Sequence, residues 1–125
     1  ILDVNTQAIL NADLHCHSVV SDGTLTPEEL ASRAKANGVE LWALTDHDEI
    51  GGQARACAAA REAGLPYLTG TEISVTFANK TVHIVGLGFD ADDPQLVQGL
   101  RSTRPGFSVV QVLTAPSGSR SRNIT

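Results

Sequence analysis

The chain has 125 residues, of which 42% are hydrophobic and 18% charged, with two cysteines. This composition predicts one soluble domain in a reducing, cytoplasmic compartment, because it excludes a disulfide framework and no apolar run approaches the ~20 residues that a membrane span needs. All 14 acidic residues lie before residue 94 beside only five basic ones, a net charge of −9, so phosphate binding to this part of the chain would require bound cations.

Two elements, a strand and a helix, are predicted first. Residues 8–15 contain a short apolar run that is typical of a buried strand. The following helix is predicted to begin at Pro27, because Thr26 is a suitable N-cap residue and Glu29 completes a capping box. Gly38 is expected to end this helix.

The same alternation continues after this helix. Residues 39–45 form a compact apolar run, VELWALT, and predict a second buried strand that leads into a polar loop. Residues 53–63 are strong helix formers, and Gly64 terminates the helix that they predict. A third short strand is expected at residues 67–69.

The remaining elements complete a predicted α/β fold. Residues 72–77 and 81–87 are extended runs joined at residues 78–80 as a hairpin, and a third helix is expected at residues 94–101. Strands that alternate with helices indicate a mainly parallel sheet with helices packed outside it. Residues 105–125 are rich in Ser, Gly and Arg and are expected to form a disordered or non-native tail.

Histidine and carboxylate residues follow the predicted strands. His15 and His17 project from one face of the first strand with Cβ atoms about 7 Å apart, since side chains alternate along a strand. The C-terminal ends of parallel strands meet at one edge, where sites assemble in α/β folds. Mixed imidazole and carboxylate ligands suit Mn, Zn or Fe. The cluster expected at this edge comprises His15, His17, Asp22, Asp46, His47, Asp48, Glu72 and His83.

Several residues in this region also allow a structural interpretation. His83 lies in an apolar run and, taken alone, is typical of a neutral core histidine. Asp46 and Asp48 could belong to a helix-capping loop, with Asp48 or Glu49 facing the N-terminus of the next helix. Cys16 points away from the two neighbouring histidines and is interpreted as a packed thiol, not as a nucleophile.

Five sequence motifs follow one another along the chain. They are DLHCHS at residues 13–18, SDGTLTPEEL at 21–30, ALTDHD at 43–48, GTEIS at 70–74 and HIVGLG at 83–88. Together they resemble the polymerase and histidinol phosphatase (PHP) family, and within it the bacterial stand-alone metal-dependent phosphoesterases, whose members include nucleoside 3′,5′-bisphosphatases and 5′-to-3′ exoribonucleases. The resemblance spans residues 11–104 and implies a PHP domain, here the N-terminal half of a distorted, TIM-like β/α barrel of seven strands.

The resemblance also implies the site and its chemistry. It predicts up to three divalent metal ions, with Mn favoured over Zn or Fe, and hydrolysis of phosphate esters by metal-activated water. The substrate would be a small phosphorylated nucleotide or a short RNA or DNA end. Asp13 and Asp46 are expected to orient ligand imidazoles, and Asp48 to assist proton transfer or position the substrate. The implied metal ligands are His15, His17, Asp22, His47, Glu72 and His83, with Glu72 in the bridging position.

One departure from the family motivates a second hypothesis. The family completes its site with a later histidine and an Asp-x-His motif, whereas this sequence has no histidine after His83. The alternative is a catalytically incomplete PHP fragment that acts as a metal-binding or interaction module. A zinc hydrolase of the amidohydrolase type is a weaker rival, because it also uses a His-x-His pair on a barrel strand. No feature of the sequence indicates an oligomeric state.

Overall fold

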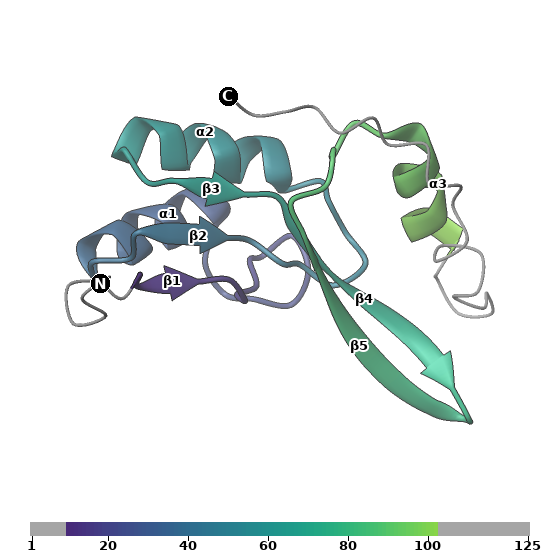
Figure 1. Ribbon diagram of the computed structural model, residues 1–125. Coiled ribbons are helices and arrows are strands. Elements are labelled where there is room, and N and C mark those ends of the chain that lie inside the picture. Colours follow the sequence, from purple (N-terminus) through teal and green to yellow (C-terminus); the bar gives the residue numbers. More distant parts are fainter. Residues whose placement is uncertain (1–9, 103–125) are drawn as a thin grey trace, which may run out of the picture.

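The computed structural model describes residues 10–102. They form a small parallel sheet, which helices cover, and a separate antiparallel ribbon (Figure 1). The sheet consists of β1 (Ala12–Asp13), β2 (Leu41–Ala43) and β3 (Tyr67–Leu68), with β2 in the middle and all three strands parallel. The helices that connect them are α1 (Pro27–Ala36) and α2 (Gln53–Ala63). The predicted alternation of strands and helices is confirmed in this part of the chain.

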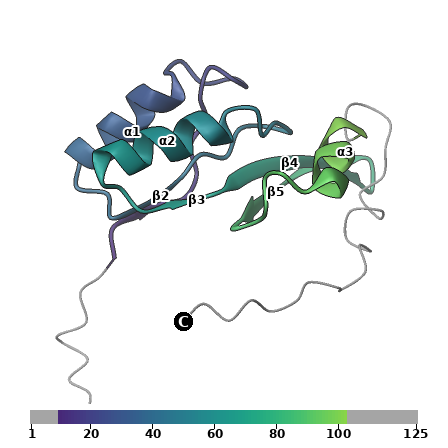
Figure 2. The ribbon, with the colours of Figure 1, turned by 90° about the horizontal axis from the view of Figure 1, so that it is seen from above.

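Both connecting helices lie on the same side of the sheet (Figure 2). Small residues on each helix are buried there, among them Ala31 of α1 and both Ala56 and Ala60 of α2. Strand β2 contributes Trp42, and the segment directly after β2 contributes Leu44. Their exposed fractions are 1% and 0%. Burial of this apolar surface is what holds the helices against the sheet.

The start of α1 follows the predicted capping pattern. Thr26 Oγ1 accepts a hydrogen bond from the main-chain N–H of Glu29 at 3.2 Å, and Glu29 Oε2 accepts one from the N–H of Thr26 at 2.8 Å. Pro27 occupies the first helical position, where its missing N–H costs no intrahelical bond. The helix ends at Ala36, before Gly38, whose φ of +79° lies in the left-handed region.

The strands β1 and β2 are shorter than the predicted runs at residues 8–15 and 39–45, of which residues 8 and 9 lie outside the described range. Beyond the two strands a side chain enters the pairing. Cys16 N–H donates to Thr45 Oγ1 at 3.1 Å, while Thr45 N–H donates to Cys16 O at 2.9 Å. Because the hydroxyl replaces a main-chain carbonyl, the segments stay side by side without a regular ladder.

The ribbon consists of β4 (Gly70–Phe77) and β5 (Lys80–Leu87), which pair antiparallel and project away from the sheet (Figure 1). The two residues between them, 78 and 79, have φ values of +49° and +61°, as a type I′ hairpin turn requires. The predicted hairpin is confirmed, although its first strand begins two residues before residue 72.

Gln53 joins β2 to β4 from a buried position at the start of α2, where it is 3% exposed. Its Nε2 donates to the carbonyl oxygens of Leu44 at 3.0 Å and Gly70 at 2.7 Å. Its Oε1 accepts from the N–H of Gly70 at 3.2 Å and from the hydroxyl of Tyr67. The amide thus takes the place of a peptide group between two strands and satisfies polar atoms that would otherwise be buried without partners.

The helix α3 (Pro94–Ser102) ends the described part of the chain, one residue beyond the predicted end at residue 101. The tail expected at residues 105–125 lies outside the described residues. Among residues 10–102, each helix lacks the length and apolar character that crossing a bilayer demands.

Candidate metal centre

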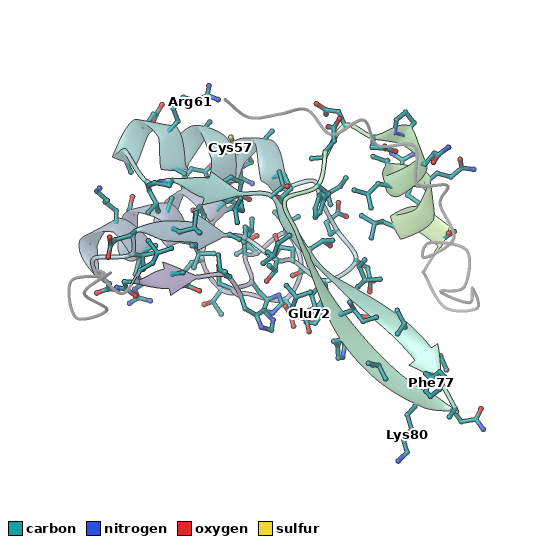
Figure 3. The ribbon with its side chains drawn as sticks, viewed as in Figure 1. Cys57, Arg61, Glu72, Phe77 and Lys80 are labelled. Carbon is teal, nitrogen blue, oxygen red and sulfur yellow. The ribbon has the colours of Figure 1, made fainter. Side chains whose placement is uncertain are left out.

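The carboxylate of Glu72 lies at the centre of a cluster at the base of the ribbon (Figure 3). Its Oε2 is 2.8 Å from His15 Nε2, 3.0 Å from His17 Nε2 and 3.8 Å from His47 Nε2, and its Oε1 is 3.6 Å from His83 Nδ1. All four histidines of the sequence therefore surround one carboxylate, whose side chain is only 8% exposed.

Asp22 supplies a second carboxylate to this cluster. Its Oδ1 lies 3.7 Å from His17 Nδ1 and its Oδ2 lies 3.5 Å from His47 Nε2. The rings of these two histidines stack with centroids 4.4 Å apart. The turn that carries Asp22 packs tightly against the histidine segment, since a Cβ on Gly23 would lie 2.1 Å from the carbonyl oxygen of His17. Glycine is therefore required at position 23.

Strand pairing explains why residues distant in sequence meet here. His47 forms a parallel bridge with Glu72, so the loop after β2 runs alongside the beginning of β4. On the ribbon, His83 is opposite Ser74, the residue two positions after Glu72. Since alternate residues of a strand share a face, His83 and Glu72 lie on the same face of the ribbon.

The cluster is open to solvent on one side. The side chains of His15 and His83 are 53% and 46% exposed, whereas those of His17 and His47 are 24% and 29% exposed. The interpretation of His83 as a neutral core histidine is therefore wrong. It comes from an apolar run, but the ribbon that carries it stands away from the helix-covered core, so its imidazole reaches solvent and the Glu72 carboxylate.

Glu72 is held in its charged form by its surroundings. Burial on its own raises the pKa of the Glu72 carboxyl. The hydrogen bond with His15 and the charges of His47, His15 and His17 outweigh burial and hold this pKa below its usual value. A carboxylate that stays ionised beside several imidazoles is a suitable ligand for a cation.

The donor atoms of the cluster fit a metal ion. His15 Nε2, His17 Nε2 and Glu72 Oε2 form a triangle with sides of 2.8, 3.0 and 3.2 Å. Neighbouring ligands of a tetrahedral ion lie about 3.4 Å apart when each is about 2.1 Å from the ion, so this triangle needs little change to accept one. In addition, His17 Nδ1 is buried and has no hydrogen-bond partner among the described residues.

Three overlapping sets of residues could each hold an ion, because the ligand atoms in each set lie within 4.8 Å of one another. The sets are His15, His17 and Glu72; His17, Asp22 and His47; and His47, Glu72 and His83. The structure thus brings together all six residues that the sequence motifs indicated as metal ligands.

Asp13 and Asp46 contact main-chain and hydroxyl groups. Asp13 Oδ1 accepts from the N–H of His15 at 3.4 Å. Asp46 is 1% exposed, and its carboxylate accepts hydrogen bonds from Ser18 and Ser21. Among the described residues, neither carboxylate forms the expected hydrogen bond with an imidazole, and both accept instead from N–H or O–H groups of the segment that carries His15 and His17.

Asp48 supports the ribbon. Its Oδ1 accepts from the N–H of Ser74 at 2.8 Å, and its backbone takes a left-handed φ of +49°. The N-cap of α2 is Gly52, with no side-chain capping bond, while Glu49 Oε1 accepts from N–H groups before the helix, including that of Gly51. No side chain of this acidic loop therefore forms a capping hydrogen bond with α2, although the Glu49 carboxylate lies against the residues directly before its N-cap.

Cys16 is a packed thiol, as predicted. Trp42 Nε1 donates to its Sγ at 3.3 Å, and the Sγ donates to the carbonyl oxygen of Ala43 at 3.4 Å. Burial raises the pKa of the thiol to about 11. The thiolate needed for nucleophilic attack is therefore disfavoured.

Four polar residues around the site were given no role by sequence reasoning. Ser18 and Ser21 bond Asp46, Ser74 lies 3.3 Å from His83 Nδ1, and Gln53 joins the strands. A weak signal was present for the first two, since each is a hydroxyl residue next to a candidate ligand. Nothing in the sequence around Gln53 distinguishes it from an exposed helix residue.

Comparison with known proteins agrees with this geometry. The sequence model of the PHP domain family matches residues 13–110. The chain is 55% identical over 96 residues to the 3′,5′-nucleoside bisphosphate phosphatase of Chromobacterium violaceum, which covers 77% of this chain and 34% of that protein. It is also 49% identical over 92 residues to a 5′-3′ exoribonuclease of Haemophilus influenzae. This match covers 74% of this chain and 34% of the relative.

Solved structures share the fold. An amidohydrolase from Chromobacterium violaceum, with bound sulfate and no metal, superimposes with a TM-score of 0.72 at 55% identity over 74% of this chain and 32% of that chain. A candidate metal-dependent phosphoesterase from Bifidobacterium adolescentis gives 0.69 at 36% identity over 73% and 32%.

The chain spans about a third of the length of the curated relatives that it matches. The matched region contains the five motifs up to residue 88 and every residue of the histidine and carboxylate cluster. The chain therefore belongs to the PHP domain family.

Proposed function

We propose that this chain is the N-terminal part of a metal-dependent phosphoesterase that hydrolyses phosphate esters of nucleotides or short oligonucleotides. The observation that carries the proposal is the convergence of four imidazoles and two carboxylates on one site. Relatives that are a nucleoside bisphosphate phosphatase and an exoribonuclease support the same reaction class. In this proposal residues 11–104 belong to a PHP domain with a seven-stranded barrel.

Six residues would hold the divalent ions. We favour Mn, with Zn or Fe as alternatives, because the donors are imidazole nitrogens and carboxylate oxygens. Glu72 turns Oε2 toward His15 and His17 and Oε1 toward His83, which suits a bridging carboxylate. When bound, such ions lower the pKa of water and neutralise phosphate oxygens. The six are His15, His17, Asp22, His47, Glu72 and His83.

Two further acids would support the reaction. Asp48 follows His47 directly, and the hydrogen bond from Ser74 fixes one oxygen of its carboxylate. Its second oxygen would position the substrate or accept a proton. Asp13 would hold the main chain of His15 through the bond to its N–H, and so act on the position of that ligand.

The test is phosphate release by the chain supplied with Mn²⁺, using a nucleoside 3′,5′-bisphosphate in one arm and a short 5′-phosphorylated RNA in the other, where mononucleotide release is measured. Glu72→Gln keeps the shape of the side chain and removes its charge. We expect this variant to be slower by about 100-fold or more, the upper end of the cost of losing a residue that supports a metal.

The matched control is Glu62→Gln, on the exposed part of α2, which should leave the rate unchanged. Equal rates for Glu72→Gln and the unaltered chain would contradict the proposal. Mn²⁺ binding by the unaltered chain without turnover of either substrate would instead identify the catalytically incomplete alternative.

A further inference from the structure

Asp46 is a buried carboxylate that the proposed reaction does not use directly. It is 1% exposed and follows β2, directly before His47. Its Oδ1 accepts from the N–H of Ser18 at 2.6 Å and from the hydroxyl of Ser21 at 2.8 Å, and its Oδ2 accepts from the hydroxyl of Ser18 at 2.7 Å. All three bonds come from the segment that connects His17 to Asp22.

The main chain of Asp46 bonds a different segment. Its carbonyl oxygen accepts from the N–H of Glu72 at 3.1 Å and from the hydroxyl of Thr71 at 3.2 Å. One residue therefore joins three stretches of chain that carry proposed ligands: the turn ending in Asp22, the loop of His47, and the start of β4.

Burying a carboxylate is costly unless hydrogen bonds replace its hydration. Here three short hydrogen bonds to the side-chain oxygens of Asp46 replace that hydration. The donors, Ser18 and Ser21, lie between the proposed ligands His17 and Asp22 in the chain, so these bonds fix the path of the chain from one ligand to the other. The Asp22 side chain is 63% exposed and has little packing of its own to hold it 3.5 Å from His47 Nε2.

We propose that Asp46 is a positioning residue of the metal centre, which holds Asp22 and His47 in one geometry through Ser18 and Ser21. This inference rests on the proposed function, because it assumes that the cluster binds metal. Asp46 touches neither the substrate nor the ion in this role. It acts on the turn that presents Asp22, and through its main chain on Glu72.

The experiment is a calorimetric titration of the metal-free chain with Mn²⁺. In Asp46→Ala all three side-chain bonds are lost, and we expect the dissociation constant of at least one Mn²⁺ site to rise about 10- to 100-fold. Asp46→Asn keeps the Oδ1 acceptor and the side-chain shape, so we expect it to restore binding to within about fivefold, the value of one neutral hydrogen bond.

A core variant serves as the control for loss of stability. Leu65 is 3% exposed and lies just before β3, whereas the cluster lies beyond the other end of the strands. Leu65→Ala should lower the melting temperature and leave the Mn²⁺ dissociation constant unchanged. If Asp46→Ala does not fold, Ser21→Ala removes a single donor, and we expect it to weaken binding by about fivefold.

The outcomes separate this inference from the proposed function. Unchanged Mn²⁺ affinity in Asp46→Ala, or in Ser21→Ala where that variant replaces it, overturns the inference alone. An equal loss of affinity in Leu65→Ala also overturns it, because stability would then explain the effect. No Mn²⁺ binding by the unaltered chain overturns the proposed function and this inference together.

Discussion

The helix-covered sheet and the ribbon are stabilised in different ways, and the candidate metal centre lies where they meet. The sheet buries Trp42 and Leu44 under two helices, with 1% or less of either residue exposed. The ribbon relies on main-chain pairing between β4 and β5, and it leaves large apolar side chains in solvent, with Phe77 near its tip 75% exposed (Figure 3). A packed region and a less supported one thus each contribute ligands to the same cluster.

The two regions also supply different ligands of the proposed metal centre. The packed region supplies His15, His17 and His47, whereas the ribbon supplies Glu72 and His83. Within the described residues, the contacts that connect the two regions include the parallel bridge between His47 and Glu72, the hydrogen bond from Ser74 N–H to Asp48 Oδ1, and the bonds of Gln53 to Gly70. The geometry of the cluster therefore depends on these polar contacts across the junction between the sheet and the ribbon.

The largest expected effect on stability is a loss of packing in the sheet region. Leu44→Ala should destabilise the fold by about 2–5 kcal/mol, because it removes a fully buried side chain and leaves a cavity. Ile84→Ala on the ribbon, where the residue is 41% exposed, should cost less than about 1 kcal/mol. Urea unfolding of both variants measures the contrast, and similar losses would show that the two regions are equally packed.

A smaller effect is expected at the junction. Gln53→Ala leaves the main-chain groups of Leu44 and Gly70 without their partners, and stranded buried polar groups cost about 1–3 kcal/mol. Urea unfolding should show this loss of stability. Relative to the unaltered chain, hydrogen exchange should become faster in β4 by a larger factor than in α1. An unchanged exchange rate in β4 would mean that Gln53 does not join the two regions.

The smallest effect is expected at the ribbon turn. Ala78 has a φ of +49°, which a residue with a Cβ adopts at a cost of roughly 1 kcal/mol. Relief of this strain in Ala78→Gly should raise the unfolding free energy by about 0.5–1 kcal/mol. The flexibility that glycine adds to the unfolded chain reduces this gain. Ala58→Gly, at an exposed position in the middle of α2, should instead lower it. A lower unfolding free energy in Ala78→Gly, as in Ala58→Gly, would contradict the turn geometry.

Local signals predicted the helices well. The bounds of α2 agree with prediction because Gly64, with a φ of +65°, ends a run of helix formers, and Thr26 caps α1 as its sequence indicated. Strand bounds were harder to predict. The pairing of Thr45 with Cys16 through a hydroxyl depends on which segments become neighbours, and this information is absent from either segment alone.

The candidate site, like the fold, was predictable from the sequence only in part. Imidazoles placed after parallel strands had to meet, so the gathering of His15, His17 and His47 followed from the order of elements. The partners of Asp46 did not follow from it. They depend on how the turn at residues 18–21 folds back, and a sequence pattern cannot distinguish an acid that faces an imidazole from one that faces a hydroxyl.

Metal binding by the cluster is tested most directly by equilibrium dialysis of the unaltered chain and of Glu72→Gln against Mn²⁺, with Glu62→Gln as the control. Glu72 and the five donor residues around it lead us to expect tight Mn²⁺ binding by the unaltered chain and by the control, and a dissociation constant raised about 100-fold or more in Glu72→Gln. Equal Mn²⁺ binding by all three proteins, or none by the unaltered chain, would contradict the assignment of this cluster as a metal centre.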